Sequence, residues 1–250
     1  DTDLFPPGTV SLNGLKIYGE ESGKVISYAA TMAHASQSGL SRLFDTLLEG
    51  EGGRLEPLDD LSFYEEGGVS GLIHGETVLF GTAAFCRKMH VTMPGGLSLK
   101  TGAFLAVAGT LIAVFAVKYT AAENVDWALH ALKRSRITPV LAVRDGSITP
   151  ALLKRKFGTD ARAVYPTIST RLALSEKDGE HPYALLYREG LMPYAEIAVG
   201  SKRLVHAVRM AAVLSLGSSA VSALLAFYLT FVGAYSALTP VSMLLYLLLW

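Results

Sequence analysis

The C-terminal part of the sequence carries no charge. The last charged residue is Arg209, and residues 210–250 contain no Asp, Glu, Lys or Arg. At about 1.5 Å of rise per residue, a helix over residues 210–232 is long enough to cross a hydrocarbon layer of about 30 Å. A second apolar run covers residues 238–250. We therefore expect a domain at residues 201–250 made of two transmembrane helices, at about 210–232 and 238–250. The alternative is a buried hairpin inside a large soluble core.

Basic residues flank only one end of the first apolar run. Lys202, Arg203 and Arg209 precede it, and the loop that follows it carries no positive charge. The positive-inside rule then predicts an integral membrane protein with residues 1–209 in the cytoplasm. The chain has 22 basic and 22 acidic residues, so its net charge gives no reason to expect a nucleic-acid partner. The single cysteine excludes a disulfide framework, and the histidines show no metal-ligand spacing, so we predict no metal site.

Residues 19–93 read as a compact α+β unit. A helix is expected over residues 24–35. Apolar residues at helical spacing indicate a second, amphipathic helix: Leu40, Leu43, Phe44, Leu47 and Leu48. Short strands are expected at residues 61–64, 69–73 and 77–80. The turn His74-Gly75-Glu76 suits a hairpin between the last two strands.

Residues 1–18 and 94–200 read as an α/β domain around that unit. The uncharged segment 103–117 is too short for a comfortable membrane span and divides at Gly109, so we predict a buried β-hairpin. A helix (121–134), a strand (138–143), a turn and a helix (149–157) then follow the rhythm of a parallel α/β sheet. Chemistry in such sheets lies at the carboxyl ends of strands. The candidate catalytic residues at such ends are Asp145 and, if a strand precedes residue 1, Asp1 and Asp3.

This order of parts resembles the P-type cation-transporting ATPases, in particular the heavy-metal branch. In that family a phosphorylation domain of the haloacid-dehalogenase type is interrupted by an α+β nucleotide-binding domain and followed by two membrane helices. The most specific stretch is 63–91, which resembles the family's G-x-G-V-x-G turn and V-L-x-G-N strand. The matching residues are Gly68, Val69, Gly71, Val78, Leu79 and Gly81. The resemblance implies ATP and Mg²⁺ as cofactors, with Gly68 and Gly71 allowing the backbone to approach the nucleotide.

The catalytic motifs of the family are altered in this chain. Aligned on Gly8 and Thr9, the phosphorylation loop D-K-T-G-T-L-T places Phe5 at the nucleophile; aligned on Asp1, it replaces the lysine by Thr2. The T-G-D turn becomes residues 143–145 (V-R-D), S-E-H-P becomes residues 36–39 (S-Q-S-G), and the late G-D-G-x-N-D motif has no match. Each lost phosphate or metal contact can cost on the order of 3 kcal/mol of transition-state stabilisation.

Three functions follow from these patterns. The first is a degenerate ATPase-like membrane protein, a fragment of a longer chain, whose ATP-driven phosphorylation is impaired or absent and which need bind no cofactor. The second is an active cation-transporting ATPase that uses the loop Asp1-Thr2-Asp3, with Asp145 helping to bind Mg²⁺. The third is a non-enzymatic membrane-tethered regulator or partner subunit. The expected partners are the membrane, a metal cation, and upstream membrane helices or a partner transporter.

Overall fold

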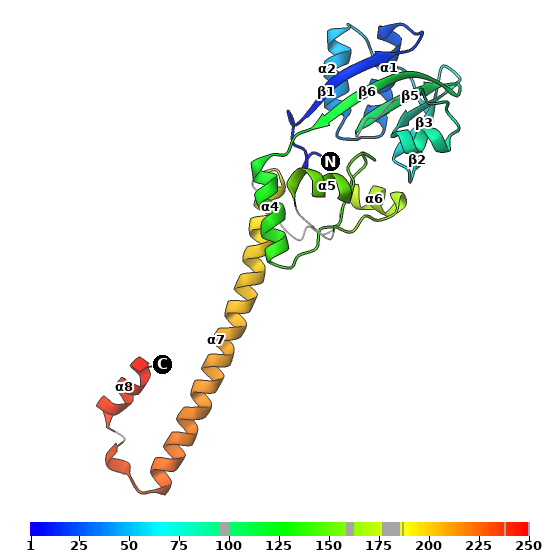
Figure 1. Ribbon diagram of the computed structural model, residues 1–250. Helices are drawn as coiled ribbons and strands as arrows, with labels where there is room; N and C mark the ends of the chain where they lie inside the picture. The colour runs from blue at the N-terminus through cyan, green and yellow to red at the C-terminus, as the bar shows by residue number, and fades with distance from the viewer. Residues whose placement is uncertain (96–100, 159–162, 177–185, 187, 238, 250) are drawn as a thin grey trace. The chain divides into compact units, whose positions relative to one another are not determined.

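The computed structural model describes residues 1–95, 101–158, 163–176, 186, 188–237 and 239–249 (Figure 1). It contains two compact units, Asp1–Ile197 and Ala198–Trp250. The first unit holds the strands and all the candidate site residues, and the second holds most of the long apolar helix and the C-terminal helix. Each unit is described here by itself.

The first unit is built on one six-stranded antiparallel sheet with the order β1-β6-β5-β4-β3-β2. Its strands are β1 (Val10–Ile17), β2 (Asp59–Tyr64), β3 (Gly68–Ile73), β4 (Glu76–Gly81), β5 (Gly102–Val107) and β6 (Thr110–Tyr119). Both faces of its centre are covered, since every residue of β5 is buried. A strand buried on both faces reads as a continuous apolar run rather than an alternating one.

The two faces of the sheet pack against different helices. One face, with Val78, Phe80 and Leu105, belongs to the core that includes α1 (Ser22–Ala35) and α2 (Ser41–Gly50). The other face, with Leu79 and Phe104, packs against the short helix α3 (Ala83–Lys88). This alternation is the two-residue period of a strand. The expected helices at 24–35 and around Leu40–Leu48 are therefore confirmed as α1 and α2.

The predicted hairpins are confirmed. β3 and β4 pair through Ile73 and Glu76, across a turn whose two residues have positive φ, 52° at His74 and 79° at Gly75. Positive φ at both central residues is the geometry that matches the twist of antiparallel strands. β5 and β6 likewise form the hairpin expected at residues 103–117.

The partners of the second hairpin differ from the prediction. β5 pairs antiparallel with β4, and β6 pairs antiparallel with β1. Strands assigned to the α/β domain (1–18 and 94–200) thus lie in one sheet with strands of the 19–93 unit, and the sheet crosses both predicted boundaries. Apolar patterning located the hairpin but carried no information on its partner, because a strand with two buried faces has the same sequence pattern in a parallel or an antiparallel sheet.

Within the part of the chain that the structure describes, the first unit also contains elements outside the sheet and its helices α1 to α3. They are α4 (Glu123–Arg134), α5 (Pro150–Phe157), α6 (Ile168–Ser175), the isolated parallel bridge Val140↔Val164 and the first residues of α7 (Leu191–Phe231). The strand expected at 138–143 is reduced to this bridge; Pro139, which has no N–H to donate, lies beside it. The helix expected at 149–157 is confirmed as α5. The sequence offers Ser147 or Thr149 as its cap, and in the structure Thr149 accepts a hydrogen bond from Leu152 N. The sequence also suggests a strand at residues 182–188, which lie mostly outside the described residues.

Helix α7 (Leu191–Phe231) is 41 residues long and contains an 18-residue window of mean hydropathy 1.9 with none of the window buried. By length and composition it is a candidate membrane span. It is followed by α8 (Pro240–Leu249), whose 10 residues are fewer than a typical span requires. Within this second unit, the hydroxyl groups of Ser222 and Tyr246 lie 2.9 Å apart and join the two helices.

Candidate functional site

The side chain of Asp1 joins three distant parts of the first unit. Its Oδ2 accepts a hydrogen bond of 2.7 Å from Gly39 N and one of 3.2 Å from Asp145 N, and its Oδ1 accepts one of 3.1 Å from Arg144 N. A Cβ on Gly39 would lie 2.7 Å from the Cβ of Asp1, so the approach requires glycine. Asp1 thus acts as an anion bound by backbone N–H groups. Sequence reasoning singled out Asp1 but missed the role of Gly39.

Asp145 is buried, at 5% exposure, and both of its carboxylate oxygens accept hydrogen bonds. Ser147 N donates to Oδ1 at 2.8 Å, and the hydroxyl group of Tyr119 donates to Oδ2. Burial raises the pKa of Asp145 above its ordinary value, and the hydrogen bonds from Tyr119 and Ser147 act in the opposite direction. The structure therefore brings Asp1 and Asp145 together, although neither follows a strand in the part of the chain that it describes: residues 138–143 form only the isolated bridge at Val140, and Asp1 precedes β1.

Asp3 is not part of this arrangement. Its side chain is exposed, and it makes no hydrogen bond to the residues that the structure describes. Phe5, which one alignment places at the nucleophile position, is 3% exposed; its ring centroid lies 4.9 Å from that of Tyr119 and 5.7 Å from that of Phe157. Phe5 is thus a core residue beneath the Asp145 loop.

The glycines expected to approach a nucleotide lie here against packed side chains. A Cβ on Gly68 would lie 2.0 Å from Cδ1 of Phe85, and one on Gly71 would lie 2.6 Å from Cδ1 of Leu58. Real Cβ atoms do not approach other atoms this closely, so the rigid Phe85 ring excludes any larger residue at Gly68, whereas a larger residue at Gly71 displaces the end of the flexible Leu58 side chain. Gly68 also borders the cleft described next, whereas Gly71 does not.

A small cleft lies where the sheet meets the Asp145 loop, with an internal volume of about 30 Å³. It is lined by Ser36, Ser38, Leu40, Gly67, Gly68, Val69, Phe80, Gly81, Thr82, Ala103, Arg144, Asp145, Gly146 and Ser147. Two backbones close it, because a Cβ on Gly146 would lie 2.1 Å from Cα of Gly67. This volume holds one or two water molecules. An adenine nucleotide is much larger than this volume.

Glu66 stands where the G-x-G-V-x-G motif has its first glycine, and Thr82 stands where the V-L-x-G-N motif has its asparagine. These two residues interact with each other. The Thr82 hydroxyl donates to the Glu66 carbonyl at 2.6 Å and accepts from Phe85 N at 3.2 Å, which caps α3. The Glu66 carboxylate pairs with Lys88, and this hydrogen bond lowers the pKa of Glu66. These residues fix the turn before β3 to the start of α3.

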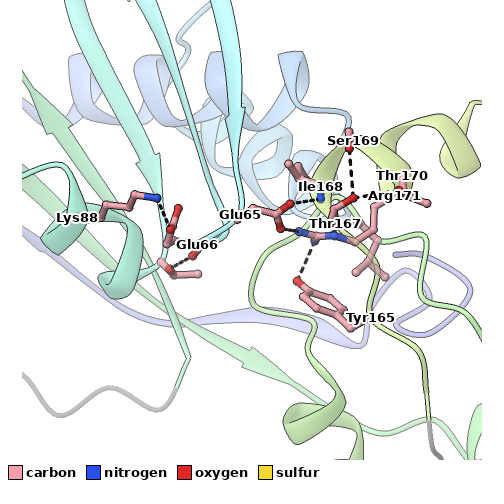
Figure 2. Close-up of polar contacts among 11 residues, drawn as sticks. Glu65, Glu66, Lys88, Tyr165, Thr167, Ile168, Ser169, Thr170 and Arg171 are labelled. Carbon is pink, nitrogen blue, oxygen red and sulfur yellow. Dashed lines mark hydrogen bonds and ion pairs between the residues drawn. The ribbon is translucent and has the colours of Figure 1, made fainter.

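A second polar cluster was not marked by any sequence motif. Arg171, in the first turn of α6, is fully buried at 0% exposure, and Figure 2 shows Glu65 reaching it from the turn between β2 and β3. Its Nη1 donates to the Tyr165 hydroxyl at 2.8 Å, and its guanidinium carbon lies 4.3 Å above the Tyr165 ring centroid. An arginine among the apolar residues of a short helix is the one signal that the sequence offers for this cluster.

The residues at the site do not fit a magnesium ion in this arrangement. Mg²⁺ binds through carboxylate oxygens and retained waters. Both oxygens of Asp1 and both oxygens of Asp145 already accept hydrogen bonds from the protein. Among the residues that the structure describes, no group of three or more His, Cys, Asp or Glu side chains is placed to hold a metal ion.

No family model and no curated protein matches the chain. Solved structures that match include the N-domain of HMA6, a copper-transporting P-type ATPase, with 15% identity over 44% of this chain and 100% of that one and a TM-score of 0.39. The N-domain of HMA8, also a copper-transporting P-type ATPase, has 16% identity, 42% and 98% coverage and a TM-score of 0.37. A zinc-transporting PIB-type ATPase has 14% identity over 55% of this chain, which spans 23% of that chain, with a TM-score of 0.36. Identities and TM-scores this low do not show that the chain belongs to their family.

Proposed function

We propose that the chain is the cytoplasmic catalytic-type region and the last membrane helices of a protein similar to the P-type cation-transporting ATPases, in which ATP-driven phosphorylation is impaired or absent. One observation carries this proposal. Asp145, which lines the cleft, and Asp1 beside it use their carboxylate oxygens to hold backbone and tyrosine donors. These carboxylates act as structural anchors in the place where the family has a nucleophile and a phosphate-binding turn.

The topology of the sheet supports an interrupted α/β domain. The chain enters the sheet at Val10 and leaves it at Tyr119, and these two residues are partners across β1 and β6. The connection continues one residue further, because Thr120 N donates to the Thr9 carbonyl at 2.8 Å. Entry and exit at one point are what an insertion into another domain requires. We extend the proposal to a haloacid-dehalogenase-like domain around this insertion.

Phosphoryl transfer depends on positioned charge around the transferred group, with little covalent chemistry by the protein itself. Neither alignment of the N-terminal loop supplies the family's lysine, since the position falls on Thr2 or on Pro6. The buried ring of Phe5 cannot form an acyl phosphate. These absences support impaired phosphorylation rather than an altered but efficient site.

The membrane part of the proposal rests on the apolar C-terminus. We propose that the part of α7 after Arg209 and helix α8 lie in the membrane and that residues 1–209 are cytoplasmic, because Lys202, Arg203 and Arg209 precede the apolar run. The proposed partners are the membrane, upstream membrane helices or a partner transporter, and a transported metal cation.

The test is phosphoenzyme formation by the full chain in detergent, with Mg²⁺ and γ-labelled ATP. We expect no acid-stable label on the wild type. A label that disappears in Asp1→Asn or Asp3→Asn, but persists in the exposed control Asp60→Asn, would refute the proposal and establish the active alternative. Equilibrium binding of ATP, measured in parallel, separates a chain that binds nucleotide without turnover from one that binds none.

A further inference from the structure

Two adjacent glutamates in the turn between β2 and β3 point to different partners (Figure 2). Glu66 pairs with Lys88 of α3, next to the same sheet. Glu65 instead reaches α6, where its Oε1 accepts a hydrogen bond of 2.6 Å from Ile168 N. The turn is thus attached on one side to α3 and on the other side to a helix more than 100 positions later in the sequence.

Arg171 gives the second half of the Glu65 contact. Its Nη2 lies 3.5 Å from Oε2 of Glu65, an ion-pair distance at which no hydrogen bond forms. Among the residues that the structure describes, neither Nη2 nor Nε has a hydrogen-bond partner, although Arg171 is fully buried. Buried cationic donors without acceptors are costly, so this guanidinium retains the capacity to bind a further anionic oxygen.

The Glu65 carboxylate occupies a position that also suits an anion from outside the chain. The first turn of α6 presents free N–H groups and the positive end of the helix dipole, and Arg171 adds a full positive charge. Glu65 is itself 49% exposed, so water and solutes reach the carboxylate although they do not reach Arg171. A side chain held in this way is an internal ligand that a stronger anion can replace.

The same contact holds the cleft closed. Glu65 is two residues before Gly67, whose backbone touches Gly146. On the other side, Nη1 of Arg171 donates to the Val143 carbonyl at 3.3 Å, at the start of the loop that carries Gly146. The contacts of Arg171 with Glu65 and with the Val143 carbonyl therefore connect the turn between β2 and β3 to the loop that carries Gly146. The turn and this loop have to separate for the cleft to open.

We propose that Glu65 is an autoinhibitory clasp: it occupies an oxyanion position formed by the start of α6 and Arg171, and it keeps the cleft closed until a phosphate group displaces it. The clasp is inferred from the contacts of Glu65 with Ile168 and Arg171 and from the contact of Arg171 with Val143. That the opened cleft takes a nucleotide rests on the proposed function. A phosphate group has the advantage over Glu65 of a higher negative charge and three acceptor oxygens, which match the unused donors of Arg171.

The opening is measured as a distance between β2 and α5 in the full chain in detergent. Spin labels are attached to Ser62→Cys and Ala151→Cys, two exposed positions, and the distance distribution is recorded by pulsed electron resonance. The native Cys86 is buried and does not take up label. Glu65→Ala is expected to raise the ratio of open to closed molecules about tenfold, the effect of losing one hydrogen bond to a charged group. Glu66→Ala removes the same charge from the neighbouring position and is expected to leave the distribution unchanged.

Ligand displacement is tested on the same labelled protein with inorganic phosphate and with ATP in separate arms, against chloride at equal ionic strength. Opening by both assigns the site to a phosphate group in general, and opening by ATP alone assigns it to a nucleotide. Equal distributions in the Glu65→Ala and Glu66→Ala variants would refute the clasp. Opening in Glu65→Ala without any response to phosphate or ATP would refute the ligand. If Glu65→Ala opens the cleft but the protein binds no ATP, the result supports the clasp and refutes nucleotide binding.

Discussion

Replacing Gly68 by alanine should destabilise the protein through a clash with Phe85. The added Cβ would lie 2.0, 2.2 and 2.5 Å from three atoms of the Phe85 ring, whereas carbon atoms in contact lie about 3.5–4.0 Å apart. The ring therefore has to move by about 1.5 Å or more. Phe85 is fully buried in a cluster with Cys86 and Phe104, so no free space receives it. Overpacking of this kind costs about 1–3 kcal/mol, and a displacement this large places Gly68→Ala near the upper end.

The assay is chemical unfolding of the full chain in detergent, followed by circular dichroism. Gly23→Ala is the matched control, because its Cβ meets nothing within 4 Å and it lies in helix α1, where alanine is favoured. In a Phe85→Leu background the cost of Gly68→Ala should fall, since two residues in contact are energetically coupled. A Gly68→Ala variant that unfolds within about 0.5 kcal/mol of the wild type but loses ATP affinity would refute the packing explanation and support a ligand-contacting role.

Three further measurements follow from the site and its surroundings. Burial raises the pKa of Asp145, so the folded protein binds the proton of this carboxyl group more tightly than the unfolded chain does. The protonated group therefore contributes its full stabilisation at a pH below its pKa in the unfolded chain. This stabilisation is lost as the pH rises through its pKa in the folded protein. Unfolding at a series of pH values should therefore show Asp145→Asn gaining stability relative to the wild type as the pH rises above about 4, and parallel curves would contradict this. Burial raises the pKa of the Cys86 thiol to about 11, so a maleimide should label it only after denaturation, and rapid native labelling would show an open core. Thr149→Ala removes the cap of α5 and should cost about 0.5–2 kcal/mol, whereas Thr167→Ala, whose side chain makes no capping bond to α6, should cost less; equal losses in thermal or chemical unfolding would contradict the capping assignment.

Local elements were predictable from the sequence, and their long-range pairing was not. The helical stripe of Leu43, Phe44 and Leu47 and the turn at His74 determine structure within a few residues, and both predictions are confirmed. The pairing of β1 with β6 depends on which neighbouring elements pack against the buried faces of each strand, and the sequence of a strand does not specify its neighbours. The predicted boundaries at 18/19 and 93/94 failed to follow the sheet for this reason.

The site was predictable to a similar extent. The sequence singled out Asp1 and Asp145 as residues at strand ends, but in the structure they meet through a hydrogen bond between two loops. It also included Asp3, which the structure leaves exposed, since a D-x-D pattern does not show which carboxylate turns inward. Arg171 and Glu65 were missed because their contact joins a β-turn to a helix through side chains alone, and no local pattern marks either residue.

The pairing of Val10 with Tyr119 also has a consequence for how the protein folds. Closing a chain segment of this length costs conformational entropy, and that cost falls sharply once the strands in between have already assembled. The inner strands form from neighbouring hairpins, so they supply the surface on which β6 and then β1 dock. Since the two ends of the segment from Thr9 to Thr120 meet across one hydrogen bond, a short linker in its place would keep the ends of the flanking chain at the same spacing. The flanking chain would nevertheless lose the contacts that Gly39, Glu65 and Tyr119 make with it.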